Sequence, residues 1–413
     1  MIWKPGRCGC ISCQGFCQAN KLRQVSDVAK NLQSALHPGG PLSDLKRYWV
    51  GFNMVKGIGA VRFQALLDHF GDARSAWEAP GEALRAAGLS SKIVGNLVSM
   101  RAQINLDQIW EQIQAQKICV ITWEDKGYPR RLKEIDQPPS VLYKSGELLP
   151  EDEWAVAIVG TRRITAYGRQ VTEEIASTLA RRGITVVSGL ARGVDGVAHQ
   201  AALNAGGRTL AVLGSGVNRV YPPEHRRLAE KIRDHGALLS GYAPGTPPEA
   251  SNFPPRNRII SGLALAVVVV EAGETSGALI TANFAAEQGR DVFAVPGNIL
   301  APQSQGTNRL VQQGAQPLLN VKDLLEALDL TAVAEHKAAR SILPADAMEA
   351  QLLGILGIEP LHVDEIRDQT GLPIEKVSAT LALMELKGMV RQVGGMNYIA
   401  VRDGSASYET GGN

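Results

Sequence analysis

The stretch that decides the fold reads AVAIVGTRRITAYGRQVTEEIASTLARRGITVVS and covers residues 155–188. It begins and ends with a short apolar run rich in β-branched residues, which is typical of strands buried on both faces. Between the two runs, Val171, Ile175 and Leu179 recur at every fourth position, the spacing of one face of a helix. The stretch therefore predicts a strand, a helix over residues 168–182 packed on the sheet, and a second strand.

The same alternation continues along the chain. Strands are predicted at residues 155–159, 184–188, 209–213, 237–240, 264–271 and 291–295. Helical patterns separate these runs, and a crossover of that kind joins strands that run parallel. Residues 116–328 therefore predict an α/β domain built on a mainly parallel, Rossmann-like sheet.

Helical regions flank this domain. Residues 45–115 predict a small domain of the helix-hairpin-helix or SAM-like type, because a Gly-x-Gly turn at residues 57–59 precedes an apolar helical run over residues 61–70. Residues 80–105, with a break at 87–90, resemble a second copy. The amide groups of such a turn can hold a phosphate, but the glycines can equally make a tight turn between packed helices.

The C-terminal part predicts a linker at residues 329–344, a winged helix at 345–401 and a disordered tail at 402–413. The expected recognition helix, residues 375–388, balances Lys376 and Lys387 against Glu375 and Glu385. A helix that reads a DNA groove presents several cations on one face. We therefore expect this winged helix to contact a protein or to regulate, rather than to read DNA.

Composition limits the possible functions. The 413 residues include 20% charged side chains and carry a net charge of +2, so a site for a polyanion must be local. The longest apolar run, residues 263–270, is too short to span a membrane, and no secretory signal is recognisable, so the cytoplasm is expected.

Cysteines cluster in the irregular N-terminal segment, residues 1–44. Cys8, Cys10, Cys13 and Cys17 could supply four thiolates to zinc or to an iron–sulfur centre. Their spacing, C-x-C-x2-C-x3-C, fits no common zinc pattern. We therefore expect no metal and no cofactor.

Small, polar or basic turns follow the predicted strands, whose carboxyl ends meet along one edge of a parallel sheet. The residues that we expect to bind a ligand there are Gly160, Thr161, Arg162, Ser188, Gly189, Arg192, Gly193, Phe253, Arg256, Asn257, Arg258, Ser276 and Gly277. Amides and arginines suit successive phosphates, and Phe253 or Tyr221 suits a base. The pattern indicates a single-stranded nucleic acid.

Two other chemistries fit less well. A dinucleotide site needs G-x-G-x-x-G in the first turn and an acid after the second strand, but the first turn reads GTRRIT and the strand ends in Ser188. A catalytic site could use Asp195 with His199, or Glu271. An i, i+4 pair is also common without function, so no enzyme activity is expected.

In their order and spacing, the small, polar or basic turns that follow the predicted strands resemble those of the DprA (Smf) family of DNA-processing proteins over residues 154–315. The resemblance implies a cytoplasmic homodimer of natural transformation and recombination. It implies that the protein binds single-stranded DNA, displaces single-strand-binding protein and loads the RecA recombinase, without catalysis. By position it assigns DNA contacts to residues 160–162, 188–193, 256–258 and 276–277.

The chain departs from the family pattern at Ser240-Gly241, where Ser-Glu is usual, and at Glu224-His225, where an asparagine is commoner. The alternative is a lysine-decarboxylase-like enzyme that cleaves nucleoside monophosphates. Its Pro-Gly-Gly-x-Gly-Thr run corresponds here at best to EAGETSG at residues 271–277, without the proline and the double glycine.

Overall fold

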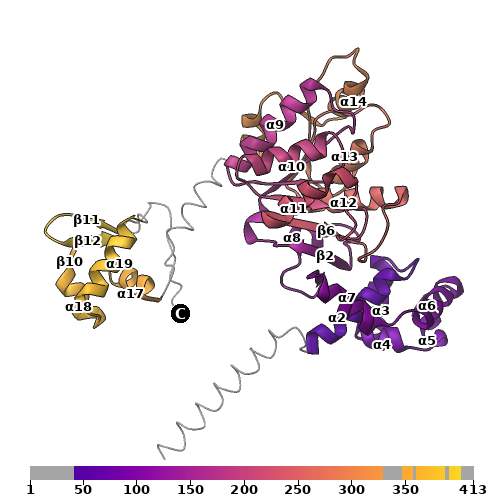
Figure 1. Ribbon diagram of the computed structural model, residues 1–413, viewed down its shortest axis with the longest axis horizontal. Helices are drawn as coiled ribbons and strands as arrows, with labels where there is room; N and C mark the ends of the chain where they lie inside the picture. Colours follow the sequence, from indigo (N-terminus) through magenta and orange to yellow (C-terminus); the bar gives the residue numbers. More distant parts are fainter. Residues whose placement is uncertain (1–40, 329–346, 357–359, 387–389, 401–413) are drawn as a thin grey trace, which may run out of the picture. The chain divides into compact units, whose positions relative to one another are not determined.

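The computed structural model describes residues 41–328, 347–356, 360–386 and 390–400 (Figure 1). The described residues fall into two compact units, and the chain passes from the first to the second between Leu324 and Leu325. The predicted helical and α/β regions both belong to the first unit, and the predicted winged helix belongs to the second. The cysteine cluster, the predicted linker and the predicted tail lie outside the described residues. None of the described helices has both the length and the apolar composition needed to cross a bilayer.

One nine-stranded sheet organises the first unit, with the strand order β1-β2-β6-β5-β4-β3-β7-β8-β9. The strands are β1 (Cys119–Thr122), β2 (Val141–Gly146), β3 (Ala155–Val159), β4 (Thr185–Ser188), β5 (Thr209–Val212), β6 (Gly236–Ser240), β7 (Ala266–Val269), β8 (Asp291–Ala294) and β9 (Gln316–Pro317). Every pair from β6 to β9 is parallel, whereas β2 is antiparallel to both β1 and β6. The mainly parallel, Rossmann-like sheet is thus confirmed.

The predicted strand boundaries hold where the apolar run coincides with the hydrogen-bonded ladder. β3 matches its prediction at both ends, whereas β7 is four residues shorter than the predicted strand at 264–271. Ala264 and Val270 lie outside β7 but are as buried as strand residues, so their hydropathy does not mark where the strand ends.

Helices cover the sheet between its strands (Figure 1). They are α8 (Arg130–Lys133), α9 (Ala166–Arg181), α10 (Val194–Asn204), α11 (Arg226–Asp234), α12 (Phe253–Leu263), α13 (Gly277–Glu287) and α14 (Gln305–Gln312), and α15 (Val321–Ala327) follows β9. α9 begins two residues before the predicted start because Thr165 caps it, accepting a hydrogen bond from the Gly168 amide at 3.0 Å. Ile175 and Leu179 are buried, as the spacing predicted, and Val171 is half-buried.

The strand order reverses next to β3. From β3 the chain adds β4, β5 and β6 on one side, and then returns to add β7, β8 and β9 on the other. In open parallel sheets, ligands bind where the order reverses, beyond the carboxyl ends of the strands. The ends of β3 and β7 therefore mark the crevice to inspect.

The helical region contains α2 (Pro41–Met54), α3 (Ala60–Phe70), α4 (Ala73–Glu78), α5 (Gly81–Ala86), α6 (Ser91–Gln103) and α7 (Leu106–Ala115). α2 begins four residues before the predicted start. Two helix–turn–helix pairs occur where the paired hairpins were predicted, α2 with α3 and α5 with α6. Their core is aromatic: the ring of Phe52 lies 5.0 Å from that of Phe63 and 5.1 Å from that of Trp77. This core continues into β1 and β2 through buried Val120 and Tyr143.

The second unit is a winged helix, as predicted. It comprises α17 (Ala347–Ile355), β10 (Leu361–His362), α18 (Val363–Thr370), α19 (Ile374–Leu386), β11 (Val390–Gln392) and β12 (Asn397–Ala400). The three strands pair antiparallel in the order β10-β12-β11. Val377, Leu381 and Met384 form a buried stripe of α19.

Candidate nucleic-acid interface

A carboxylate of the protein fills the crevice between β3 and β7. Glu271 is 3% exposed and accepts hydrogen bonds from the amide of Thr165, at 3.0 Å, and from its hydroxyl. A Cβ atom at position 168 would lie 2.3 Å from a carboxylate oxygen of Glu271, so only glycine fits there. Helix N-termini at this point of a Rossmann-like sheet commonly hold a pyrophosphate. Here the protein's own anion occupies that position.

A second carboxylate fills the turn after β4. Asp195, in the first turn of α10, is buried, and its Oδ2 atom accepts hydrogen bonds from the amides of Gly189 and Ala191, both at 3.2 Å. Burial raises the pKa of Asp195, whereas the nearby charge of Arg256 and the amide hydrogen bonds lower it. The amides that the sequence assigned to a phosphate at this turn are therefore already engaged within the protein.

Arg256 lies beneath the turns rather than on them. Its side chain is 4% exposed, and its Nη1 atom donates hydrogen bonds to the carbonyls of Gly189, at 2.5 Å, and Val212, at 2.6 Å. Burial lowers the pKa of Arg256 to about 10, while the charge of Asp195 raises it, so the guanidinium is protonated at neutral pH. The side chain ties α12 to the turns after β4 and β5.

A shallow depression opens above this buried network. Its lining consists of Arg162, Gly189, Ala191, Arg192, Tyr221, Pro222, Phe253 and Arg256. The guanidinium carbons of Arg162 and Arg256 each lie 5.5 Å from the centre of the Phe253 ring. The Tyr221 ring lies 6.2 Å from the same ring. Two cations and a second aromatic ring therefore surround Phe253, which suits a phosphate next to a stacked base. We call this depression the rim.

Arg192 carries its own counter-ion. The guanidinium is 60% exposed and forms an ion pair with the carboxylate of Glu224, which is 47% exposed. The hydrogen bond between them raises the pKa of Arg192 and lowers that of Glu224. Exposed pairs of this kind are weak, so a phosphate can compete with Glu224 for Arg192.

Several predicted site residues lie outside the rim lining. Ser188 is fully buried, and its hydroxyl donates to the Ile158 carbonyl at 2.6 Å. The Asn257 amide donates to the Gly277 carbonyl at 3.3 Å, and Ser276 caps α13. Gly160, Thr161, Gly193 and Arg258 are likewise absent from the lining. Thr161 supports its turn instead, because its amide donates a hydrogen bond to the Glu271 carbonyl at 2.7 Å.

Tyr221 and Pro222 of the rim lining were missing from the predicted site, as was Glu224, which pairs with the rim residue Arg192. Tyr221 was considered only as an alternative stacking residue, and Glu224 only as a departure from a family pattern. Tyr221-Pro222 follows the turn after β5, so an aromatic residue in a strand-end turn was the available signal. Nothing local to Glu224 indicates that it pairs with Arg192, which lies 32 residues earlier.

Both members of the candidate acid–base pair, Asp195 and His199, are buried. His199 is fully buried, its Nδ1 atom lies 2.6 Å from the Thr209 hydroxyl oxygen, and burial lowers its pKa to about 3. Asp195 bonds to backbone amides, and Glu271 is bonded to Thr165. In the part of the chain that the structure describes, no group of three or more His, Cys, Asp or Glu residues is placed to hold a metal ion.

The fold and the site define a class of protein. It is a Rossmann-like α/β protein whose crevice is filled by its own carboxylates and whose rim gathers arginines around an aromatic ring. The family described as DNA recombination-mediator protein A matches residues 119–329, and the DprA winged helix domain matches residues 336–396. The chain belongs to this family, which confirms the resemblance to DprA (Smf) proteins.

Individual relatives agree with this assignment. Protein Smf of Synechocystis sp. is 37% identical over 388 residues, which is 85% of this chain and 98% of that protein. The DNA processing protein DprA of Bacillus subtilis is 44% identical over 54% of this chain and 75% of its own length. The X-ray structure of DNA processing protein A from Streptococcus pneumoniae superposes with a TM-score of 0.60 at 34% identity, covering 68% of this chain and 97% of that one.

Proposed function

We propose that the rim binds single-stranded DNA. The observation that carries this proposal is that Arg162, Arg192 and Phe253 line one depression, in which the Arg162 guanidinium lies 5.5 Å from the centre of the Phe253 ring. Guanidinium groups bind phosphates, and an exposed aromatic edge or face can stack on a base that is free of a duplex. Membership of a DNA-processing family supports DNA as the polymer. The same proposal includes binding without catalysis and without a cofactor.

We further propose that the bound strand is transferred to the RecA recombinase in natural transformation and recombination, in competition with single-strand-binding protein. The recombination-mediator family supports this role, and the cytoplasm, where RecA acts, is the proposed location. A homodimer belongs to the same proposal. Exposed apolar side chains support a protein contact near the β9 edge of the sheet: Ile299 is 80% exposed, Leu300 83% and Leu319 76%.

The test is a binding titration of a labelled oligo-dT strand and of a duplex of equal length, between about 50 and 200 mM salt. We expect tighter binding of the single strand and a logarithmic salt slope of about −0.7 for each phosphate neutralised. The double variant Arg162→Ala/Arg192→Ala should bind about 30-fold more weakly, because two charge-assisted contacts are lost. Lys376→Ala, on α19, is the matched control. A double variant that binds as tightly as the wild type would refute the rim as the DNA site.

A further inference from the structure

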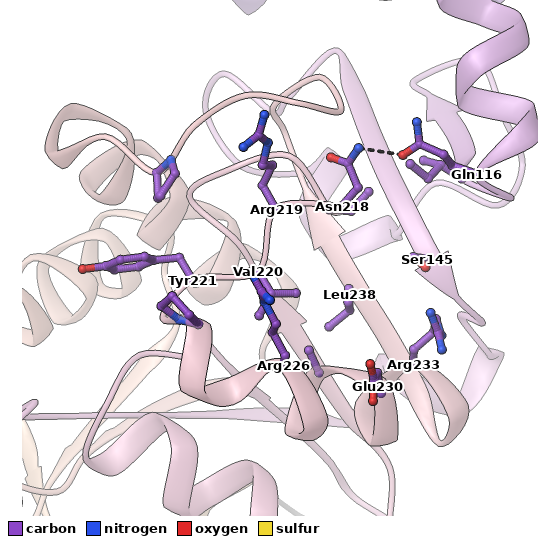
Figure 2. A pocket seen from close by; sticks show the side chains of 15 residues that line it. Gln116, Ser145, Asn218, Arg219, Val220, Tyr221, Arg226, Glu230, Arg233 and Leu238 are labelled. Atoms are coloured by element: carbon purple, nitrogen blue, oxygen red, sulfur yellow. Dashed lines mark hydrogen bonds between the residues drawn. The ribbon is translucent and has the colours of Figure 1, made fainter.

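A larger groove adjoins the rim. It has a volume of about 600 Å³ and is formed by the loop after β5, by α11 and by neighbouring parts of β2 and β6 (Figure 2). Tyr221 lines both the groove and the rim. In Figure 2, Tyr221 lies at one end of the groove, and Gln116 and Arg233 lie toward the other. A ligand that lies over Phe253 in the rim can therefore continue past Tyr221 into this groove.

The charge of the groove is positive. Arg219, Arg226 and Arg233 line it, against one carboxylate, that of Glu230. Arg226 and Arg233 lie seven positions apart on α11, which places them on one face about 10.5 Å apart along the helix axis. Among the described residues, no carboxylate lies within ion-pair distance of Arg219 or Arg226, and the nearest to Arg233 is its neighbour Asp234, at 3.7 Å. Among the described residues, Arg219 and Arg226 therefore lack the internal counter-ion that Arg192 has in Glu224, whereas Arg233 has one in Asp234.

The groove also offers surfaces for bases and sugars. Half-buried Val220 contributes apolar lining, while Ala229 and Leu238 form the buried floor beneath it. At the end away from Tyr221, the Asn218 amide donates a hydrogen bond to the Gln116 side-chain oxygen at 2.6 Å, shown as a dashed line in Figure 2. A groove that combines several arginines with an apolar side chain and Tyr221 suits a polyanion whose bases are unpaired.

We propose that this groove is the continuation of the single-stranded DNA path. The strand passes from the rim over Tyr221 and lays its next phosphates along Arg226 and Arg233, with Arg219 on the facing loop. This inference rests on the proposed function of the rim and adds a second binding segment to it. The length of strand that the protein engages is therefore greater than the rim alone can hold.

The test measures how tightly the full-length chain binds two oligo-dT strands of different length. A strand of about four nucleotides fills the rim, and one of about twelve also reaches the groove. In the variant Arg226→Gln/Arg233→Gln, the short strand should bind as in the wild type, whereas the long strand should bind about ten-fold more weakly. Its logarithmic salt slope should fall by about 1.4, because two phosphate contacts are lost.

A matched control lies on the same helix. Arg227 and Lys231 are exposed residues of α11 that do not line the groove, so Arg227→Gln/Lys231→Gln removes the same charge from another face. This control should bind both strands as the wild type does. Thermal unfolding of all three proteins checks that α11 remains folded.

The possible outcomes separate the groove from the rim. If the groove variant binds both strands like the wild type, while Arg162→Ala/Arg192→Ala binds neither well, the inference is overturned and the proposed function stands. If the groove variant loses the short and the long strand equally, or if the control variant loses as much, the inference is also overturned. If the wild type binds no strand of either length, both proposals fail together.

Discussion

The rim and helix α19 of the winged helix are two places where proteins of these folds can bind nucleic acid. They differ in which groups surround their cations. At the rim, exposed Arg162 and Arg192 line the same depression as Phe253, and the Arg162 guanidinium lies over its ring. On α19, the described cation is Lys376, which is exposed next to Glu375 and has no aromatic neighbour on the helix. A cation is present in both regions, but only the rim combines it with a stacking surface.

The difference extends below the surface. Under the rim, Asp195 and Arg256 bond to the backbone of the turns and fix their course. Under α19 lies an apolar stripe, Val377, Leu381 and Met384, which holds the helix in place but orients no charged group on its outer face. The turns that carry the rim arginines are therefore held by a buried polar network, whereas α19 is held by apolar packing.

The largest effect is expected from breaking that network. Arg256→Ala leaves the Asp195 carboxylate and the Gly189 and Val212 carbonyls buried without their cation. Removing one partner of a buried charged pair costs about 3–5 kcal/mol, so the unfolding free energy of the first unit should fall by that amount in a urea titration. Lys376→Ala on α19 should leave unfolding unchanged. If Arg256→Ala were as stable as the wild type, the rim would not depend on buried support.

The stacking surface gives the next largest effect. Phe253→Leu keeps an apolar side chain but removes the ring, and stacking on an aromatic residue contributes about 1–3 kcal/mol per base. Affinity for a single strand should fall about ten-fold, while the salt slope stays the same because no charge is lost. Leu383→Ala, an exposed apolar residue of α19, is the control and should bind normally. A changed salt slope in Phe253→Leu would mean that the arginines had moved.

The smallest effect is expected from the counter-ion of Arg192. Glu224→Gln removes the carboxylate that competes with phosphate, so single strands should bind about three-fold more tightly at low salt. Glu375→Gln, beside Lys376 on α19, removes the same charge where no site is proposed and should have no effect. Weaker binding in Glu224→Gln would show instead that Glu224 holds Arg192 in its binding position.

Much of the fold could be predicted from local patterns, and the misses have physical causes. β1 and β2 were not predicted because they are antiparallel and separated only by the four-residue helix α8 instead of a crossover helix, and β2 ends in Lys144, Ser145 and Gly146. β9 contains two residues, which is too short for any periodicity. Such strands form because a neighbouring strand offers hydrogen bonds, not because their own sequence specifies them.

The sequence by itself determined the parallel sheet and the edge where the turns gather, because apolar runs, helical spacing and chain direction are local properties. It also placed Arg162, Arg192 and Arg256 at that edge. Only the tertiary structure decided which of them is exposed and which is buried. Arg256 donates hydrogen bonds to carbonyls 44 and 67 residues away, and Arg192 pairs with a carboxylate 32 residues away. Burial and pairing arise from contacts between distant segments, so they become visible only when the chain is folded.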